Sequence, residues 1–254
     1  MRLSRQESVW QISLPLFSEY AESKKNSRRK QSQSMTRFDF IVSELVPSAR
    51  LTGVALKNEL VVRAVLGKKY IGSAGSKITD VRTGCQLNVV DATAGLGRDA
   101  LLLAAAGCEV TALERNKLLV FLLWEAQNLV RDTSPPVVLQ GVKNVSFFQA
   151  YSQEYLADKI QNNDRPDIVY LDPMYRGTST DPAVGLKKTA AVKKTTRLLQ
   201  YFDRLFSVPA DGDSNGDGCV ETQLFNQAIA AAQQKVVVKR APNAPWLAGV
   251  KPAS

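Results

Sequence analysis

Histidine is absent from this chain of 254 residues, which excludes Ser–His–Asp triads, H-E-x-x-H metalloproteases and most catalytic zinc sites. The three cysteines, Cys85, Cys108 and Cys219, form no C-x-x-C pair, so we expect neither a disulfide framework nor a thiolate zinc site. We therefore expect no bound metal. Any reaction must use carboxylates, lysine, tyrosine, backbone groups or a cofactor.

Long apolar runs are also lacking. No stretch reaches the roughly 18 uninterrupted apolar residues that a membrane span needs, and polar residues interrupt the first apolar segment. We therefore expect a cytoplasmic protein without a membrane partner. The hydrophobic fraction of 44% and the charged fraction of 22% are typical of a globular protein with a sizeable core.

Acidic residues are fewer than basic ones, 24 against 33, which gives a net charge of +9. The basic residues gather in three stretches, 24–37, 187–197 and 235–251. Such clusters favour a polyanionic partner such as RNA, whereas the alternative is a set of solvated faces. The residues that we expect to contact RNA are Lys187, Lys188, Lys193, Lys194, Lys239 and Arg240.

The chain divides into three parts. Residues 1–40 include the polar run KKNSRRKQSQS and predict a basic, poorly ordered segment, while residues 41–86 predict a helical and loop extension with a helix over LKNELVVRAVLG. In residues 87–254, short β-branched runs alternate with helical patterns. We expect strands at 87–91, 108–114, 145–149, 167–172 and 235–239, and helices at about 99–106, 117–130, 153–161 and 221–233. This alternation predicts an α/β, Rossmann-like, doubly wound and mostly parallel sheet.

A glycine turn follows the first of these strands. Asp91 ends the strand, and A-T-A-Gly95-L-Gly97-R-D leads into a helix, where glycines and free N–H groups let a ligand approach the backbone. With Ala100 in the third position, the dinucleotide fingerprint G-x-G-x-x-G/A stays open. However, Asp91 would repel a pyrophosphate and attract a cation, and Glu114, at the end of the next strand, can accept both hydroxyls of a ribose. The arrangement resembles the S-adenosylmethionine (SAM) site of class I methyltransferases.

A second motif ends the fourth strand. The sequence Asp172-Pro173-Met-Tyr175 resembles the [DNS]-P-P-[YF] element of methyltransferases that act on an exocyclic amine of a nucleobase. There an aromatic ring stacks on a flipped base, while the Asp172 carboxylate and the Pro173 carbonyl would accept hydrogen bonds from the amine. Asp-Pro is also an ordinary way to end a strand.

The motifs together resemble one family. VVDATAGLGRDALLLAAAGCEVTALERN, IVYLDPMY and KVVVKRAPNAPWLAGV are similar, in order and spacing, to the bacterial small-subunit ribosomal RNA guanine-N2 methyltransferases of the RsmJ type, over roughly Asn58 to Val250. The resemblance implies SAM as cofactor and N2-methylguanine in 16S rRNA, at the guanine numbered 1516, as product. The SAM contacts that it implies are Arg98, Asp99, Glu114, Arg115, Tyr151, Ser152 and Asp172.

The chain departs from the family pattern at several points. The family has two small residues in place of Tyr151-Ser152 and Phe-Pro in place of Tyr175-Arg176, and it continues into a final pair of strands beyond the position of Ser254. We therefore expect that strand pair to be missing or shortened, which would leave one sheet edge exposed. Two other functions stay open: an N6-adenine methyltransferase on DNA or RNA, and a non-catalytic rRNA-binding assembly factor with a degenerate methyltransferase fold.

Overall fold

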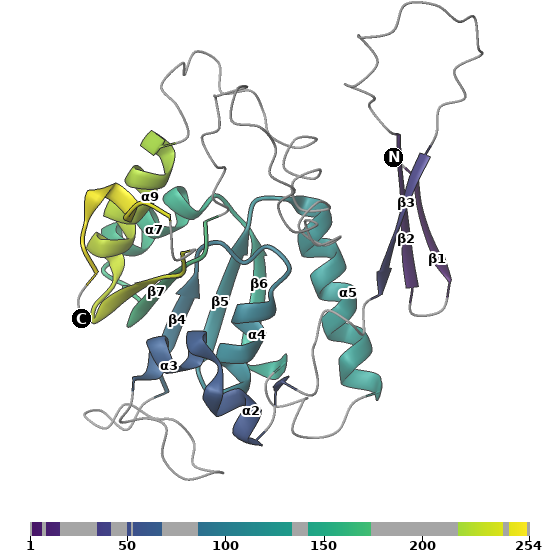
Figure 1. Ribbon diagram of the computed structural model, residues 1–254, viewed down its shortest axis with the longest axis horizontal. Helices are drawn as coiled ribbons and strands as arrows, with labels where there is room; N and C mark the ends of the chain where they lie inside the picture. Colours follow the sequence, from purple (N-terminus) through teal and green to yellow (C-terminus); the bar gives the residue numbers. More distant parts are fainter. Residues whose placement is uncertain are drawn as a thin grey trace, which may run out of the picture.

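The computed structural model describes residues 2–6, 9–15, 35–41, 50–51, 53–67, 86–133, 142–173, 218–240 and 244–252. Figure 1 shows two β-sheets in these parts of the chain. One is formed by residues near the N-terminus, and the other is packed against α-helices. Five of the expected site residues lie outside the described residues: Tyr175, Lys187, Lys188, Lys193 and Lys194.

The first sheet is antiparallel and has three strands, β1 (Arg2–Gln6), β2 (Val9–Pro15) and β3 (Met35–Ile41). These strands lie where we expected a poorly ordered segment. The reason is visible in W-Q-I-S-L and R-F-D-F, where apolar and polar residues alternate with the period of a strand. The basic run at 24–30 is outside the described residues.

The second sheet has five parallel strands in the order β6-β5-β4-β7-β8. Their bounds are β4 Asn88–Asp91, β5 Glu109–Glu114, β6 Val145–Gln149, β7 Ile168–Leu171 and β8 Lys235–Val238. This confirms the α/β, Rossmann-like class. The strand order reverses between β4 and β7, and in such sheets ligands bind outside the carboxyl ends of the strands at that reversal.

Helices cover both faces of this sheet (Figure 1). The elements are α2 (Gly53–Asn58), α3 (Leu60–Leu66), α4 (Arg98–Ala105), α5 (Lys117–Thr133), α7 (Ser152–Gln161) and α9 (Gly218–Ala231). Successive residues of β4 alternate between two cores: Val89 packs with α3, α4 and α5, and Val90 packs with α7 and α9. Each fully buried aliphatic side chain contributes about 1.5–3 kcal/mol, so both layers hold the central strands in place.

The helix expected over LKNELVVRAVLG is interrupted. Glu59 separates α2 from α3 in an extended conformation, with φ of −62° and ψ of 126°. Its carboxylate accepts two hydrogen bonds from Arg50, at 2.6 and 2.5 Å. After it, α3 buries Val61, Val62 and Val65 in the same core as α4.

The two edges of the parallel sheet differ. At β6, two side chains of α5 donate to strand carbonyls: Trp124 Nε1 to Phe147 O at 3.0 Å and Gln127 Nε2 to Val145 O at 2.9 Å. At the other edge, β8 pairs with β7 alone among the described residues, and the chain then forms the short helix η3 (Leu247–Gly249). In the described part of the chain, no helix has the length and apolar character to cross a membrane.

Candidate functional site

The turn between β4 and α4 depends on two glycines with positive φ, Gly95 at 53° and Gly97 at 66°. A Cβ on Gly97 would lie 2.7 Å from the ring of Phe147 and 3.0 Å from Leu123 Cδ2. We expected this glycine to let a ligand approach. In the structure, its missing side chain makes room for the protein's own core, so Gly97 sets how closely the turn packs on β6 and α5.

The Glu114 carboxylate lies beneath this turn, at the end of β5. Its Oε2 accepts the N–H of Gly95 at 3.0 Å, and its Oε1 accepts the N–H of Asn116 at 2.8 Å. Burial raises the pKa of Glu114, and these two N–H groups oppose the rise. Backbone donors therefore fix both oxygens, and each oxygen keeps a lone pair for a further donor such as a ribose hydroxyl.

The Asp91 carboxyl group ends β4 and is the most enclosed acid of the site, with 1% of its surface exposed. Its Oδ1 accepts the N–H of Thr93 at 3.0 Å. Burial, with smaller contributions from the charges of Asp99, Asp172 and Glu114, raises the pKa of Asp91 to about 8, while the hydrogen bond from the Thr93 N–H opposes the rise. A cation bound near Asp91 would favour its ionised form.

Asp172 follows β7 and lies beside the loop that leaves β4. Its N–H donates to Thr93 Oγ1 at 2.6 Å, and its Oδ2 accepts Lys239 Nζ at 2.7 Å. The same ammonium donates to Asp99 Oδ2 at 2.6 Å, and that oxygen also accepts the Tyr170 hydroxyl at 2.6 Å. The two acids from the two motifs are therefore linked through one lysine.

The two basic residues after β8, which we expect to contact RNA, also make contacts within the protein. Lys239 lies in the acid cluster with 52% of its side chain exposed. Burial lowers its pKa, but the hydrogen bonds to Asp172 and Asp99 outweigh this and raise it. Arg240 pairs with Glu221 of α9 at 3.1 Å and donates to the Pro245 carbonyl at 3.2 Å. With 15% of its side chain exposed, Arg240 ties α9 to the C-terminal segment.

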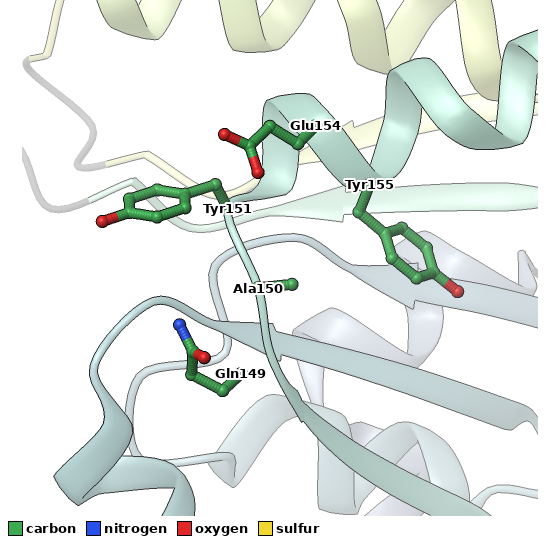
Figure 2. A pocket seen from close by; sticks show the side chains of 5 residues that line it. All are labelled: Gln149, Ala150, Tyr151, Glu154 and Tyr155. Atoms are coloured by element: carbon green, nitrogen blue, oxygen red, sulfur yellow. The ribbon is translucent and has the colours of Figure 1, made fainter.

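The turn between β6 and α7 completes the edge. Ser152 Oγ donates to the Ala92 carbonyl, and the Ala150 N–H donates to the Glu114 carbonyl at 3.2 Å, so this turn adjoins both the β4 loop and β5. An open pocket at the turn is lined by Gln149, Ala150, Tyr151, Glu154 and Tyr155 (Figure 2). Figure 2 shows the rings of Tyr151 and Tyr155 directed to opposite sides of the turn. The Tyr151 side chain is half-exposed and can meet a ligand.

The remaining expected residues lie at the rim. Arg98 is the first residue of α4 and is half-buried, Arg115 follows Glu114 and is exposed, and Pro173 follows Asp172 and is half-buried. The sequence analysis missed Thr93 and Tyr170. A signal for Tyr170 existed, because a tyrosine in the otherwise aliphatic strand I-V-Y-L needs a partner for its hydroxyl.

No group of acidic and cysteine side chains in the described part of the chain is arranged to hold a metal ion. The carboxylates of the site lie around the glycine turn, at the carboxyl ends of β4 and of its two neighbours in the sheet, β5 and β7. A family model for SAM-dependent methyltransferases matches residues 11–254. The chain belongs to this SAM-dependent methyltransferase family.

Curated proteins similar to this chain carry a more specific name. The "Ribosomal RNA small subunit methyltransferase J" of Vibrio vulnificus (strain CMCP6) is 38% identical over 185 residues, which cover 72% of this chain and 64% of the relative. The protein of that name from Idiomarina loihiensis is 35% identical over 212 residues, which cover 81% of this chain and 64% of the relative. The matched part of the chain thus spans 64% of the length of these relatives.

Among solved structures, a SAM-dependent methyltransferase from Neisseria gonorrhoeae has 30% sequence identity and a TM-score of 0.47, over 66% of this chain and 55% of that one.

The donor set of the methyltransferase fits the chemistry of SAM. A SAM molecule carries two cationic groups, an ammonium and a sulfonium, and a ribose with two hydroxyls. Asp91 is a buried carboxyl group whose ionisation a nearby cation would favour, and Glu114 is a carboxylate that backbone N–H groups hold in place. The start of α4 adds N–H groups that suit the carboxylate of a ligand.

Proposed function

We propose that the chain is a SAM-dependent methyltransferase that transfers a methyl group to the exocyclic N2 amine of a guanine in 16S rRNA, the guanine numbered 1516. The observation that supports this most directly is the 2.6 Å hydrogen bond from the Asp172 N–H to Thr93 Oγ1. It joins the Asp-Pro motif to the loop that carries the glycine turn. Asp172, which can accept a hydrogen bond from the target amine, therefore lies next to the glycine turn, which suits the cofactor.

On this proposal, the cofactor is held along the carboxyl ends of β4, β5 and β6. Glu114 would accept the ribose hydroxyls, while Asp91 would balance a cationic group and Gly95 and Gly97 would shape the turn. The other proposed contacts are Arg98, Asp99, Arg115, Tyr151, Ser152 and Asp172. Bound SAM supplies a methyl group activated by its sulfonium.

The residues after β7 would orient the amine. The Asp172 carboxylate and the Pro173 carbonyl are acceptors, so they would hold the two N–H groups and leave the nitrogen lone pair directed at the methyl carbon. The amine can attack before it loses a proton, which then passes to solvent or to Asp172. A strong base such as histidine is therefore not required, and the chain contains none. Tyr175, which would stack on the base, lies outside the described residues.

The net charge of the chain and the names of its relatives support ribosomal RNA as the substrate. The two relatives named above are called small-subunit ribosomal RNA methyltransferases. A net charge of +9 suits a phosphate-rich partner, because neutralised phosphates release counterions. We propose Lys187, Lys188, Lys193 and Lys194 as RNA contacts on the segment that follows the Asp-Pro motif, although they too are outside the described residues.

The test is incubation of the full chain with labelled SAM and small ribosomal subunits from cells that lack this methylation, followed by nucleoside analysis. Label in N2-methylguanosine at one position would support the proposal. Label in N6-methyladenosine would replace it with the adenine alternative. Cofactor binding by calorimetry without any label would favour the assembly-factor alternative.

A further inference from the structure

The acid cluster contains one cation whose position points to a role in the reaction. Lys239 Nζ lies 2.7 Å from Asp172 Oδ2 and 2.6 Å from Asp99 Oδ2. We infer that Lys239 is a positioning residue, which fixes the Asp172 carboxylate in the orientation that receives the target amine and couples it to Asp99 on the cofactor side. This inference rests on the proposed function and adds a residue to it.

The geometry of Asp172 supports this role. Thr93 holds its backbone N–H, and Lys239 holds Oδ2, so the residue is pinned from β4 on one side and from β8 on the other. Within the described residues, no group donates to Asp172 Oδ1. We therefore propose Oδ1 as the oxygen that accepts the amine. Without Lys239, the side chain, 38% exposed, could rotate and present either oxygen.

The position of Lys239 along its strand is set by the fold. Its N–H donates to the Leu171 carbonyl at 2.8 Å, which continues the β7–β8 pairing by one residue. Lys239 thus directly faces the start of the Asp-Pro motif. Because β7 and β8 are paired in parallel, the Lys239 ammonium lies at the same edge of the sheet as Asp172.

Charge around the lysine explains why a cation is needed there. Two carboxylates contact its ammonium, Asp99 from α4 and Asp172 from the end of β7, and its charge also acts on Glu59, which is paired with Arg50. The Tyr170 hydroxyl donates to the same Asp99 oxygen, and the charges of Asp99 and Asp172 also act on Asp91. Besides the Tyr170 phenol and the paired Arg50, these groups are carboxylic acids. An ammonium shared by two carboxylates reduces their mutual repulsion, and each contact is a charge-assisted hydrogen bond.

The experiment compares Lys239→Met with Lys235→Met as a matched control. Lys235 is the same residue type at the opposite end of β8, where its Nζ donates to the Ala64 carbonyl at 2.9 Å. We expect Lys239→Met to lower kcat by about thirtyfold, because a displaced reacting group costs up to a hundredfold, and to change KM for RNA by less than about threefold. Lys235→Met should leave both values unchanged.

A second readout uses the ligand-free chain and needs no activity. Asp91, whose pKa burial raises to about 8, gains negative charge between pH 5 and pH 8, so the missing ammonium matters more at the higher pH. We expect the drop in Tm of Lys239→Met to be about twice as large at pH 8 as at pH 5.5. Lys239→Arg, which keeps a cation, should recover part of kcat and the pH dependence of the wild type.

The outcomes separate the inference from the proposed function. If wild type methylates RNA and Lys239→Met raises KM for RNA with kcat unchanged, Lys239 is an RNA contact and the positioning role is wrong. A Tm drop that is equal at both pH values would reduce the lysine to a packing residue. If wild type binds SAM but transfers no methyl group, the proposed function fails, while the Tm comparison still tests whether Lys239 balances the acid cluster.

Discussion

Glu114 ends β5 and Asp172 follows β7, the two strands that flank β4, yet different kinds of donor hold their carboxylates. Backbone N–H groups of Gly95 and Asn116 bind both oxygens of Glu114. The Asp172 carboxylate instead accepts from a side chain, Lys239 Nζ at Oδ2, while Thr93 Oγ1 accepts the backbone N–H of Asp172. The first arrangement comes with the fold of the turn, whereas the second depends on single residues that one substitution can remove.

This difference suggests that the two halves of the site, one around Glu114 and one around Asp172, have different roles. The half around Glu114 is rigid because its donors belong to the turn and to the start of α5, where Asn116 Oδ1 also accepts the Leu118 N–H at 3.0 Å. The half around Asp172 is held by side-chain contacts of Thr93 and Lys239, each of which a substitution can remove individually. Substitutions on the first side should therefore affect folding most, and those on the second side should affect catalysis.

The largest effect is expected at Asp172. Asp172→Ala removes an acceptor for the amine and should lower kcat for methyl transfer by about a thousandfold, while SAM still binds weakly. Single-turnover transfer of labelled methyl to small subunits measures the rate, and calorimetry measures binding. Asp158→Ala, which removes a carboxylate that accepts only an Asn162 amide among the contacts described, is the control and should keep full activity. A fully active Asp172→Ala would contradict the mechanism.

Gly97→Ala tests the rigid half. The new Cβ would meet Phe147 at 2.7 Å on a backbone with φ of 66°, so we expect a loss of about 2–4 kcal/mol in the free energy of unfolding. Urea denaturation measures it. Gly249→Ala has a similar φ of 70° but no atom within 4 Å of the Cβ, so it should cost only about 1 kcal/mol. Equal losses for the two variants would mean that packing on Phe147 is unimportant.

Asp91→Asn addresses the buried acid between the halves. The pKa of Asp91 is raised from 3.8 to about 8 on folding, so its contribution to stability is present below pH 4 and is lost as the pH rises through 8. Asparagine keeps an oxygen for the Thr93 N–H and carries no charge. The Tm of the ligand-free variant should exceed that of wild type by about 5 °C at pH 8 and by less at pH 5, because ionisation adds roughly 2 kcal/mol of cost. A constant difference across this range would show that Asp91 does not titrate there.

The smallest effect is expected at Asn116. Its Oδ1 accepts the N–H groups of Leu118 and Leu119 at 3.0 and 3.2 Å, which is the capping arrangement at the start of α5. Asn116→Ala should cost about 1 kcal/mol in stability, and Asn116→Asp, which keeps the acceptor, should cost less. Thermal unfolding distinguishes them. If alanine and aspartate behave alike, the cap contributes little.

The sequence predicted the parallel sheet well because its cues are local. The strand expected at 145–149 has those bounds, and the order of strands and helices puts the ends of β4, β5 and β7 at one edge. Contacts between distant residues were not predictable. Gly97 packs against Phe147, and Lys239 meets Asp99 and Asp172, because of how elements far apart in the chain are packed. The ion pair between Arg50 and Glu59, at the break between α2 and α3, was likewise not predicted.

The contacts between α5 and β6 have a consequence for how the chain is made. Trp124 and Gln127 reach carbonyls of Phe147 and Val145, which follow them by 23 and 18 residues. An exposed strand edge is a template for association with other chains while a protein is still incomplete. Here the residues that cover part of the outer edge of β6 belong to α5, so this cover uses no residue of β7 or β8, which follow later in the chain. A nascent chain would then offer fewer free carbonyls to its neighbours on a polysome.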